Sequence, residues 1–339
     1  MSSAVVATLS NFNYLNEQFQ TTLMAELVNA LKLVGSGILS LASETLIPKG
    51  QSGAFVDIPQ YITSADIADQ VVSGQDANFY GFSDYKMRAV WVQRQKVWKV
   101  EDLVKIIGNK DPIGELIRQL TNYWTYNFQA TALSEIAGCF AGPLASGTAN
   151  SHSTGSQYSG STISYDGILA AKQLLGDKQF SLDKAIANSK VMNNAVLQNI
   201  AQFPNSILGN TTAEEGNVAR LAGMNTWMDD QMTAVNNVYS TYFSAANQLV
   251  YQLDNWKRTD INGNPVVSQG VDVEFFREPQ KGGGTSVIYT RCKYLVHLNG
   301  LAYNSNTENP TNAQLATGSN WTFVADDNRK CQIVELQTA

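Results

Sequence analysis

Histidine and cysteine are scarce in this chain, and each scarcity removes a class of chemistry. Only two histidines, His152 and His297, occur in 339 residues. Neither a histidine-rich zinc site nor a choice of bases for a catalytic triad is therefore expected. The three cysteines, Cys139, Cys292 and Cys331, lie far apart and form no C-x-x-C pair. We expect buried free thiols and not a framework of disulfides.

Long apolar runs are missing as well. The most apolar stretch, residues 31–47, is interrupted by Lys32, Gly35, Gly37 and Glu44, so no membrane-spanning segment and no membrane partner are predicted. The first 14 residues contain neither the basic region nor the apolar region of a signal peptide.

Charged residues make up only 15% of the chain, whereas about 25% is usual. Amides replace them, because 30 asparagines and 23 glutamines stand beside 23 basic and 29 acidic residues. An apolar content of 44% argues against disorder. The net charge of −6 argues against a dedicated nucleic-acid binder, which would show a basic domain.

The length suggests two domains, or one domain with large excursions. Helices and strands are predicted in mixed order, without a regular β-α-β rhythm, which indicates an α+β fold. Short helices are expected over 166–175 and 192–203, and strands over 185–189, 224–232, 271–276, 286–297 and 332–336.

An amphipathic helix is predicted over residues 12–34, where apolar residues recur every three or four positions from Phe12 to Val34. Two interpretations remain open. The helix packs on the core of its own subunit, or it forms an arm on a neighbouring subunit.

A long β-hairpin is predicted over residues 48–100, with strands at 55–58 and 85–100. Its first arm is acidic and its second arm is basic. The charges either pair across the hairpin or set the register of a ribbon laid over another subunit. The candidate intersubunit contacts are Asp57, Asp66, Asp69, Asp76, Lys86, Arg88, Arg94 and Lys96.

A long helix is predicted over residues 112–137. Asp111 suits the N-cap, Pro112 suits the first helical position, and Gly138 is expected to end the helix. Its length of about 40 Å exceeds that of a usual globular helix. Trp124 and Phe128 lie on the apolar stripe and are expected in the core.

No set of residues predicts an active site, and we expect no enzyme, no cofactor and no metal. The glycines after Lys281 lack the spacing of a phosphate loop and predict a hairpin turn. The carboxylates of Asp229–Asp230, and equally of Asp326–Asp327, are expected to point to opposite faces of a strand. His297 lies in an apolar strand and is expected to be structural, while His152 falls in a Gly/Ser-rich loop over 142–161.

The order of these elements resembles the major capsid proteins of tailed double-stranded DNA bacteriophages, which have the Hong Kong 97 fold. Four segments are similar to that family's patterns: KDPIGELIRQLTNYWTYNFQATALSEIAGCF, AIANSKVMNNAVLQNI, GMNTWMDDQM and YLVHLNGLAYNSNTENPTNAQLATGSNW. The hairpin corresponds to the family's extended loop, the E-loop, and the long helix to its spine helix.

The resemblance implies a set of domains. These are an N-terminal arm (1–47), the E-loop (48–100), a peripheral domain with the spine helix (101–190), an axial domain (191–270) and returning strands (271–339). It also implies self-assembly into pentamers and hexamers of an icosahedral head in the virion, built in the host cytoplasm. The implied partners are a separate scaffolding protein, a portal, a decoration protein and weakly contacted DNA.

Two alternatives remain open at this point. An encapsulin-like cellular shell has the same fold and encloses an enzyme. A soluble enzyme or sugar-binding domain would use the Asp229 region or the aromatic tip of the hairpin.

Overall fold

The computed structural model describes residues 22, 23, 25, 37–43, 47, 53–61, 84–101, 112–145, 162–202, 219–232, 234–259, 265–280 and 283–338. The helices are α4 (Pro112–Ala141), α6 (Tyr165–Gln173), η2 (Gly176–Ser181), α7 (Ser189–Leu197), α8 (Asn312–Leu315), η3 (Gly318–Asn320) and η4 (Asn328–Lys330). The first strands are β1 (Leu39–Leu41), β2 (Phe55–Tyr61), β3 (Asp84–Val90), β4 (Val92–Glu101), β5 (Lys184–Ala187), β6 (Ala201–Gln202), β7 (Ala219–Leu221) and β8 (Met224–Met228). The remaining strands are β9 (Tyr239–Ser244), β10 (Leu249–Leu253), β11 (Asn255–Thr259), β12 (Pro265–Gln269), β13 (Val271–Gln280), β14 (Gly283–Leu298), β15 (Leu301–Tyr303), β16 (Trp321–Phe323) and β17 (Ile333–Thr338).

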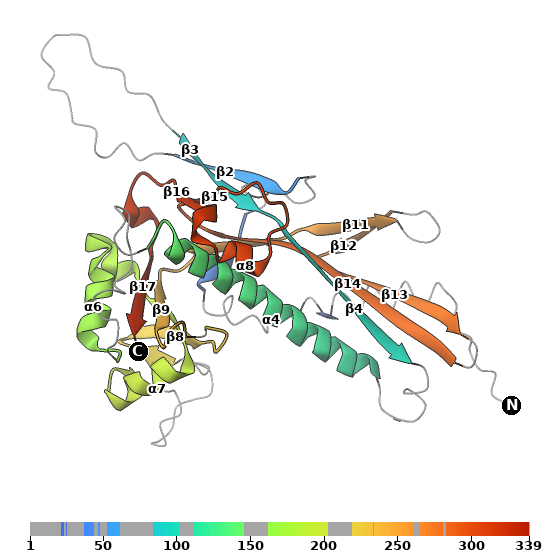
Figure 1. Cartoon of the computed structure of the whole chain (residues 1–339), viewed down its shortest axis with the longest axis horizontal. Helices are drawn as coiled ribbons and strands as arrows, with labels where there is room; N and C mark the ends of the chain where they lie inside the picture. Colours follow the sequence, from blue (N-terminus) through green and yellow to red (C-terminus); the bar gives the residue numbers. More distant parts are fainter. Residues whose placement is uncertain are drawn as a thin grey trace, which may run out of the picture.

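The 16-residue strand β14 is the centre of a five-stranded sheet. One edge of β14 pairs with β4, and the other pairs first with β13 and then with β10. β1 adds to β10 in parallel. The ribbon of β4, β14 and β13 extends away from the rest of the molecule beside α4 (Figure 1).

Helix α4 packs against one face of this sheet through the predicted apolar stripe. Trp124 and Phe128 are buried, which confirms the expectation for both. The Phe128 ring lies 5.7 Å from the ring of Tyr251 on β10 and 5.1 Å from that of Tyr294 on β14. Burial of large side chains at helical spacing explains why this segment folds as one long helix.

A second sheet of six strands has the order β17-β9-β5-β8-β7-β6. Helices α6 and α7 cover one face, where Ile168 and Met192 join the same apolar cluster as Phe243 of β9. The other face receives the end of α4, and the Phe140 ring stacks on Tyr242 at 5.3 Å. The last turns of α4 therefore belong to the cores of both sheets.

The hairpin is present, but the prediction that its second arm runs from 85 to 100 is wrong. β2 pairs with β3 from Phe55↔Val90 to Tyr61↔Asp84. After Val90 the chain changes partner, and β4 pairs with β14 instead of with β2. Val90, Trp91 and Val92 are buried one after another, because the strand passes from one sheet to the next.

Gly138 does not end the long helix, which continues to Ala141. Because it has no side chain, Gly138 allows the backbones of α4 and α8 to approach closely. A Cβ atom at Gly138 would lie 1.9 Å from the carbonyl oxygen of Leu315 on α8. The indole N–H of Trp321 donates a 2.7 Å hydrogen bond to that same oxygen. Glycine is therefore needed here to let α8 dock on α4.

Each sheet combines strands that lie far apart in the sequence. β5 lies beside β8 and β9 in the six-stranded sheet, and β10 lies beside β1 and β14 in the five-stranded sheet. The domain boundaries themselves stay predictions.

Several predicted segments lie wholly or mostly outside the described residues. Of the amphipathic segment 12–34, only Thr22, Leu23 and Ala25 are described. All three are helical, and Leu23 is fully buried. The hairpin tip and most of the Gly/Ser-rich segment 142–161 are not described. Within the described ranges, no helix has the length and apolar character that a membrane span requires.

Candidate intersubunit surface

The described base of the hairpin is amphipathic. Val56, Ile58 and Met87 point inward and form one apolar cluster with Leu295 of β14. Asp57 and Lys86 alternate with them, and both side chains are exposed. The alternation fixes which side chains the hairpin presents outward.

Asp57 and Arg88 face each other directly across the hairpin, as the cross-strand interpretation requires. The Arg88 guanidinium also lies 3.8 Å from the centre of the Phe55 ring. Phe55 stacks on Tyr303 at 6.4 Å, and Tyr303 meets Trp321 at 5.3 Å. A chain of rings thus fixes the base of the hairpin to the core.

Arg94, predicted as an intersubunit contact, is engaged within its own subunit. Its guanidinium donates to the Asn309 side-chain oxygen at 2.9 Å and to the Pro310 carbonyl oxygen at 2.6 Å. The neighbouring Gln93 N–H donates to the same Asn309 oxygen at 2.8 Å. Arg94 therefore holds the segment that precedes α8.

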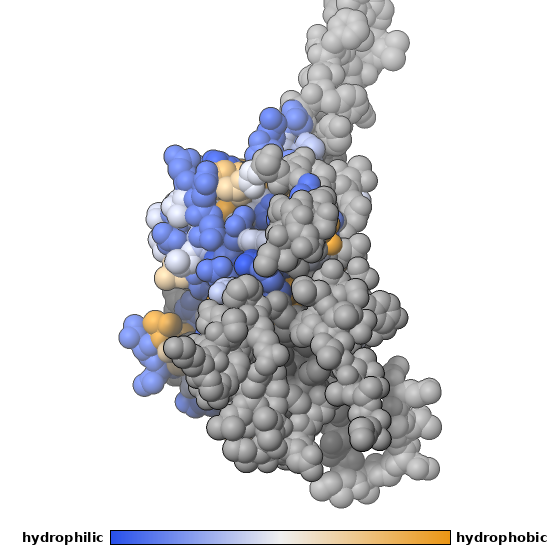
Figure 2. Space-filling model, turned by 90° about the vertical axis from the view of Figure 1, so that its right-hand side faces the viewer, coloured by the Kyte–Doolittle hydropathy of each residue, from blue (hydrophilic) through white to orange (hydrophobic). Residues whose placement is uncertain are grey.

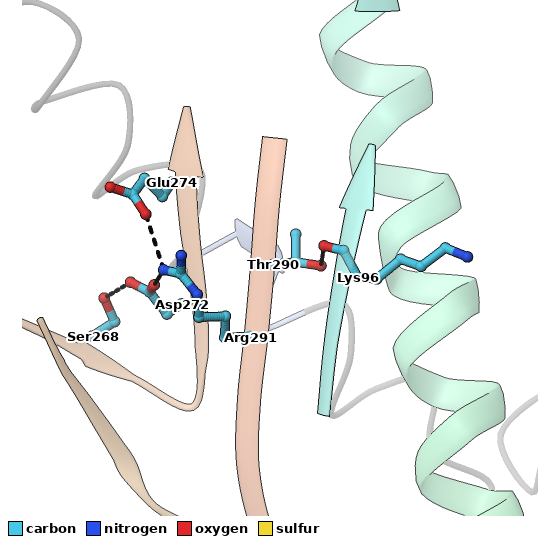
Figure 3. A network of polar contacts seen from close by, with 6 residues as sticks. All are labelled: Lys96, Ser268, Asp272, Glu274, Thr290 and Arg291. Carbon is cyan, nitrogen blue, oxygen red and sulfur yellow. Dashed lines mark hydrogen bonds and ion pairs between the residues drawn. The ribbon is translucent and has the colours of Figure 1, made fainter. Parts of the chain in front are cut away.

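Lys96 lies on the face of β4 that looks toward α4 (Figure 3). Its ammonium group is 5.7 Å from the centre of the Tyr123 ring and 5.9 Å from that of Trp98. These distances suit a cation–π contact within the subunit. The acidic candidates Asp66, Asp69 and Asp76 lie outside the described residues.

The opposite face of the sheet carries a polar network that sequence reasoning missed (Figure 3). Arg291 on β14 donates to Asp272 at 3.2 Å and to Glu274 at 2.9 Å, both on β13. Ser268 of β12 donates to Asp272, whose side chain is fully buried. The register pairs Asp272 with Arg291 across 19 positions in the sequence, so no local motif could reveal it.

The adjacent acids Asp229 and Asp230 follow the end of β8 at Met228, so the prediction that both lie on a strand over 224–232 is wrong, and they have different partners. Asp229 accepts from the backbone N–H of Gln231 at 3.0 Å, and Asp230 from that of Ser189 at 3.1 Å. Asp230 therefore occupies the N-terminus of α7. Near the chain end, Asp326 pairs with Lys330 and Asp327 with Arg329. The described part of the chain contains no group of three or more His, Cys, Asp or Glu residues that could hold a metal.

The three cysteines are buried and free, which confirms the prediction. Burial raises the pKa of Cys292 and of Cys331 to about 12, so neither is a reactive thiolate at neutral pH.

His297 is structural, as predicted, but it has an unexpected neighbour. Its Nε2 lies 2.9 Å from the Leu301 carbonyl oxygen, and its Nδ1 lies 3.9 Å from Glu135 of α4. The same Glu135 oxygen accepts from the Leu298 N–H at 2.8 Å. Burial lowers the pKa of His297 to about 4 and raises the pKa of Glu135 well above its usual value.

This burial predicts an acid-side loss of stability. The unfolded chain binds a proton at His297 below about pH 6.5, whereas the folded chain binds it only near pH 4. Stability from this group is therefore lost as the pH falls through that window, by about 3 kcal/mol in all. The free energy of unfolding of His297→Gln, measured with denaturant at pH 7, 5 and 4, should fall less with decreasing pH than that of the parent chain. An equal fall in the two proteins would contradict the assignment.

The surface in Figure 2 is largely hydrophilic over the described residues, with small apolar patches between polar side chains. Such a surface suits contacts whose specificity comes from polar and charged groups.

No protein-family model matches the chain. A major capsid protein of Bacillus phage SPP1 is 24% identical over 315 residues, which cover 89% of each chain. Among solved structures, the Cyanophage Pam1 capsid asymmetric unit has a TM-score of 0.52 at 11% identity and matches 93% of this chain and 92% of that one. The capsid of a native GTA particle has a TM-score of 0.50 at 11% identity, over 91% and 90% of the two chains. The chain therefore has the α+β Hong Kong 97-type capsid fold, and its resemblance to the major capsid proteins of tailed bacteriophages is confirmed.

Proposed function

We propose that this chain is the structural subunit of an icosahedral phage head. The observation that carries the proposal is the relation to the SPP1 major capsid protein along nearly the whole of both chains. The fold supports it, because capsid structures match over more than nine tenths of this chain.

Copies of the chain are proposed to assemble into pentamers and hexamers that enclose double-stranded DNA. Shell subunits need more contact area than the roughly 1,600 Å² of an ordinary interface. The long ribbon of β4, β14 and β13 gives the subunit such reach (Figure 1). The role is structural, and no enzymatic activity is proposed.

Further partners follow from the same proposal. A separate scaffolding protein, a portal and a decoration protein act during assembly in the host cytoplasm, and the finished protein resides in the virion. The net charge of −6 suits a wall that contacts packaged DNA weakly. Neither an encapsulin-like shell nor a soluble enzyme or sugar-binding domain is favoured by the comparisons.

Sedimentation and electron microscopy of the purified protein test the proposal. We expect capsomers or closed shells that form as protein concentration is raised. A single 37.0 kDa species at every salt and protein concentration would overturn it.

The structure changes how an intersubunit role of the hairpin should be tested. Arg94 is unsuitable, because its hydrogen bonds stabilise the subunit itself. Arg94→Gln should lower the free energy of unfolding by about 1–3 kcal/mol. Lys86 is exposed on the hairpin, so Lys86→Glu should leave subunit stability within about 0.5 kcal/mol.

If the hairpin lies over a neighbouring subunit, Lys86→Glu should nevertheless reduce shell yield. Salt should partly restore the yield, because it screens the new repulsion within about 10 Å at 0.1 M. Thermal melting of the subunit and shell yield at two salt concentrations separate the two effects. Unchanged yield for Lys86→Glu would mean that the hairpin charges serve only the hairpin.

A further inference from the structure

The turn that follows β14 is held to helix α4 by two buried titratable side chains. The backbone N–H of Leu298 donates a 2.8 Å hydrogen bond to Oε1 of Glu135, and the carbonyl oxygen of Leu301 lies 2.9 Å from Nε2 of His297. His297 is 0% exposed and Glu135 is 1% exposed. We call Glu135 and His297 the buried pair. Both ends of the turn therefore depend on it.

The same turn supports the base of the hairpin. The N–H of Gly300, inside the turn, donates to the sulfur of Met87 on β3 at 3.0 Å. Tyr303, just beyond the turn, stacks on Phe55 of β2 at 6.4 Å. The buried pair thus connects α4, through one turn, to both strands of the hairpin base.

Hydrogen-bond chemistry determines where the hydrogens of the pair lie. A carbonyl oxygen only accepts, so the hydrogen of the His297 ring is on Nε2 and points to Leu301. In a neutral ring Nδ1 then carries a bare lone pair, and Nδ1 has no hydrogen-bond partner within the described residues. This lone pair lies 3.9 Å from Oε1 of Glu135. A carboxylate beside it would be a buried and uncompensated charge, so a second proton belongs to one of the two groups.

Within the described part of the chain, no lysine or arginine side chain is buried. The other ionisable side chains of the surrounding core come from α4, β9, β17 and the segment before β17, and they are two thiols, a phenol and a carboxyl group: Cys139, Cys331, Tyr242 and Glu335. Lys330, which precedes Cys331, forms an ion pair with Asp326. Among these groups, none supplies a free positive charge that would stabilise a carboxylate at Glu135.

We propose that Glu135 is a neutral carboxylic acid at neutral pH and that its proton, directed at His297, latches the turn onto α4. The alternative, an imidazolium beside a carboxylate, would require two ions to be taken out of water. Burial also raises the pKa of Glu135 well above its usual value and outweighs the Leu298 hydrogen bond, which favours the carboxylate. Once this proton is lost, a carboxylate faces the Nδ1 lone pair, and the turn loosens from α4 together with the hairpin base.

The latch sets the direction of a pH effect. In the unfolded chain Glu135 loses its proton near pH 4.5, whereas in the folded chain it keeps the proton to a higher pH. The stability that this group contributes is therefore complete below pH 4.5 and is lost as the pH rises through the raised pKa. The direction is opposite to that of His297, whose contribution is lost as the pH falls.

Glu135→Gln tests the protonation state, because an amide reproduces the protonated acid. Its oxygen accepts from the Leu298 N–H and its NH₂ group donates to Nδ1 of His297. The melting temperature of the variant should equal or exceed that of the parent at pH 6, and the advantage should widen by several degrees at pH 8.5. A constant difference between the two proteins, or a variant less stable than the parent at both pH values, would overturn the proposal.

Glu274→Gln is the matched control, because the same change there removes an ion pair. Glu274 accepts from Arg291 at 2.9 Å. The control should lower the melting temperature at both pH values and gain nothing at the higher one. An equal gain in the control would show that the effect does not come from Glu135, which would also overturn the proposal.

Nitrogen NMR of the histidine rings tests the latch in the full-length parent chain, so this result does not depend on the folding of a variant. Only His152 and His297 occur in the sequence, and His297→Gln identifies the signal of His297. We expect a neutral His297 ring with its hydrogen on Nε2 at pH 7. A doubly protonated ring at pH 7 would overturn the proposal. Neither measurement requires assembly, so failure of the latch leaves the capsid role untouched.

Discussion

Gly138→Ala is expected to yield no soluble, folded protein. In an ordinary helix interior this change stabilises by about 1 kcal/mol, because alanine is the better helix former. Here the added Cβ would lie 1.9 Å from the Leu315 carbonyl oxygen and 2.7 Å from the indole nitrogen of Trp321. The oxygen cannot move aside easily, since a capping box of Thr311 and Gln314 fixes α8 and Trp321 donates to it. Soluble yield and circular dichroism of the variant measure the effect.

Gly176→Ala is the matched control. No atom lies within 4 Å of a Cβ built there, and the only penalty is the positive φ of 56°. The control should therefore lose only about 1–2 kcal/mol and remain folded. A Gly138→Ala protein as stable as this control would show that α8 does not pack so closely on α4.

Trp124→Ala is expected to be insoluble as well. The Trp124 ring is 2% exposed between α4 and the five-stranded sheet and touches Tyr123 edge to face at 5.3 Å. Removal of so large a buried ring costs about 3–5 kcal/mol, which is a large part of the stability of a typical domain. Expression level and thermal melting give the measurement.

Trp124→Phe separates lost volume from lost polarity. The indole N–H of Trp124 has no hydrogen-bond partner within the described ranges, so the change to phenylalanine removes no hydrogen bond. The phenylalanine variant should fold with a modest loss. Full solubility of Trp124→Ala would contradict the core position.

The sequence predicts those parts of the fold that local periodicity controls. The apolar stripe of α4 is a pattern of adjacent helical turns, and the strands of the hairpin base are rich in strand-forming residues, so the sequence predicts both elements. The change of strand partner at Trp91 was not, because residues 85–100 read as one continuous strand. Only the pairing of β4 with a strand some 190 positions later decides its place.

Long-range contacts likewise decide which candidate residues face outward. Arg94 and Lys86 look alike in sequence as bases on one arm. Arg94 donates hydrogen bonds to Asn309 and Pro310, while Lys86 is exposed. Gly138 was predicted to end the helix for a similar reason. Its contact with Leu315 is distant in the sequence, and no residue near Gly138 indicates it.

Helix α4 joins the two sheets energetically. Leu133, Ile136 and Phe140 pack in a core that includes Tyr294 of one sheet and Tyr242 of the other. Neither sheet can lose its packing without exposing the end of this helix to water. The energetic cost of that exposure couples the sheets, and we expect the described cores to melt in one cooperative transition and not as two separate units.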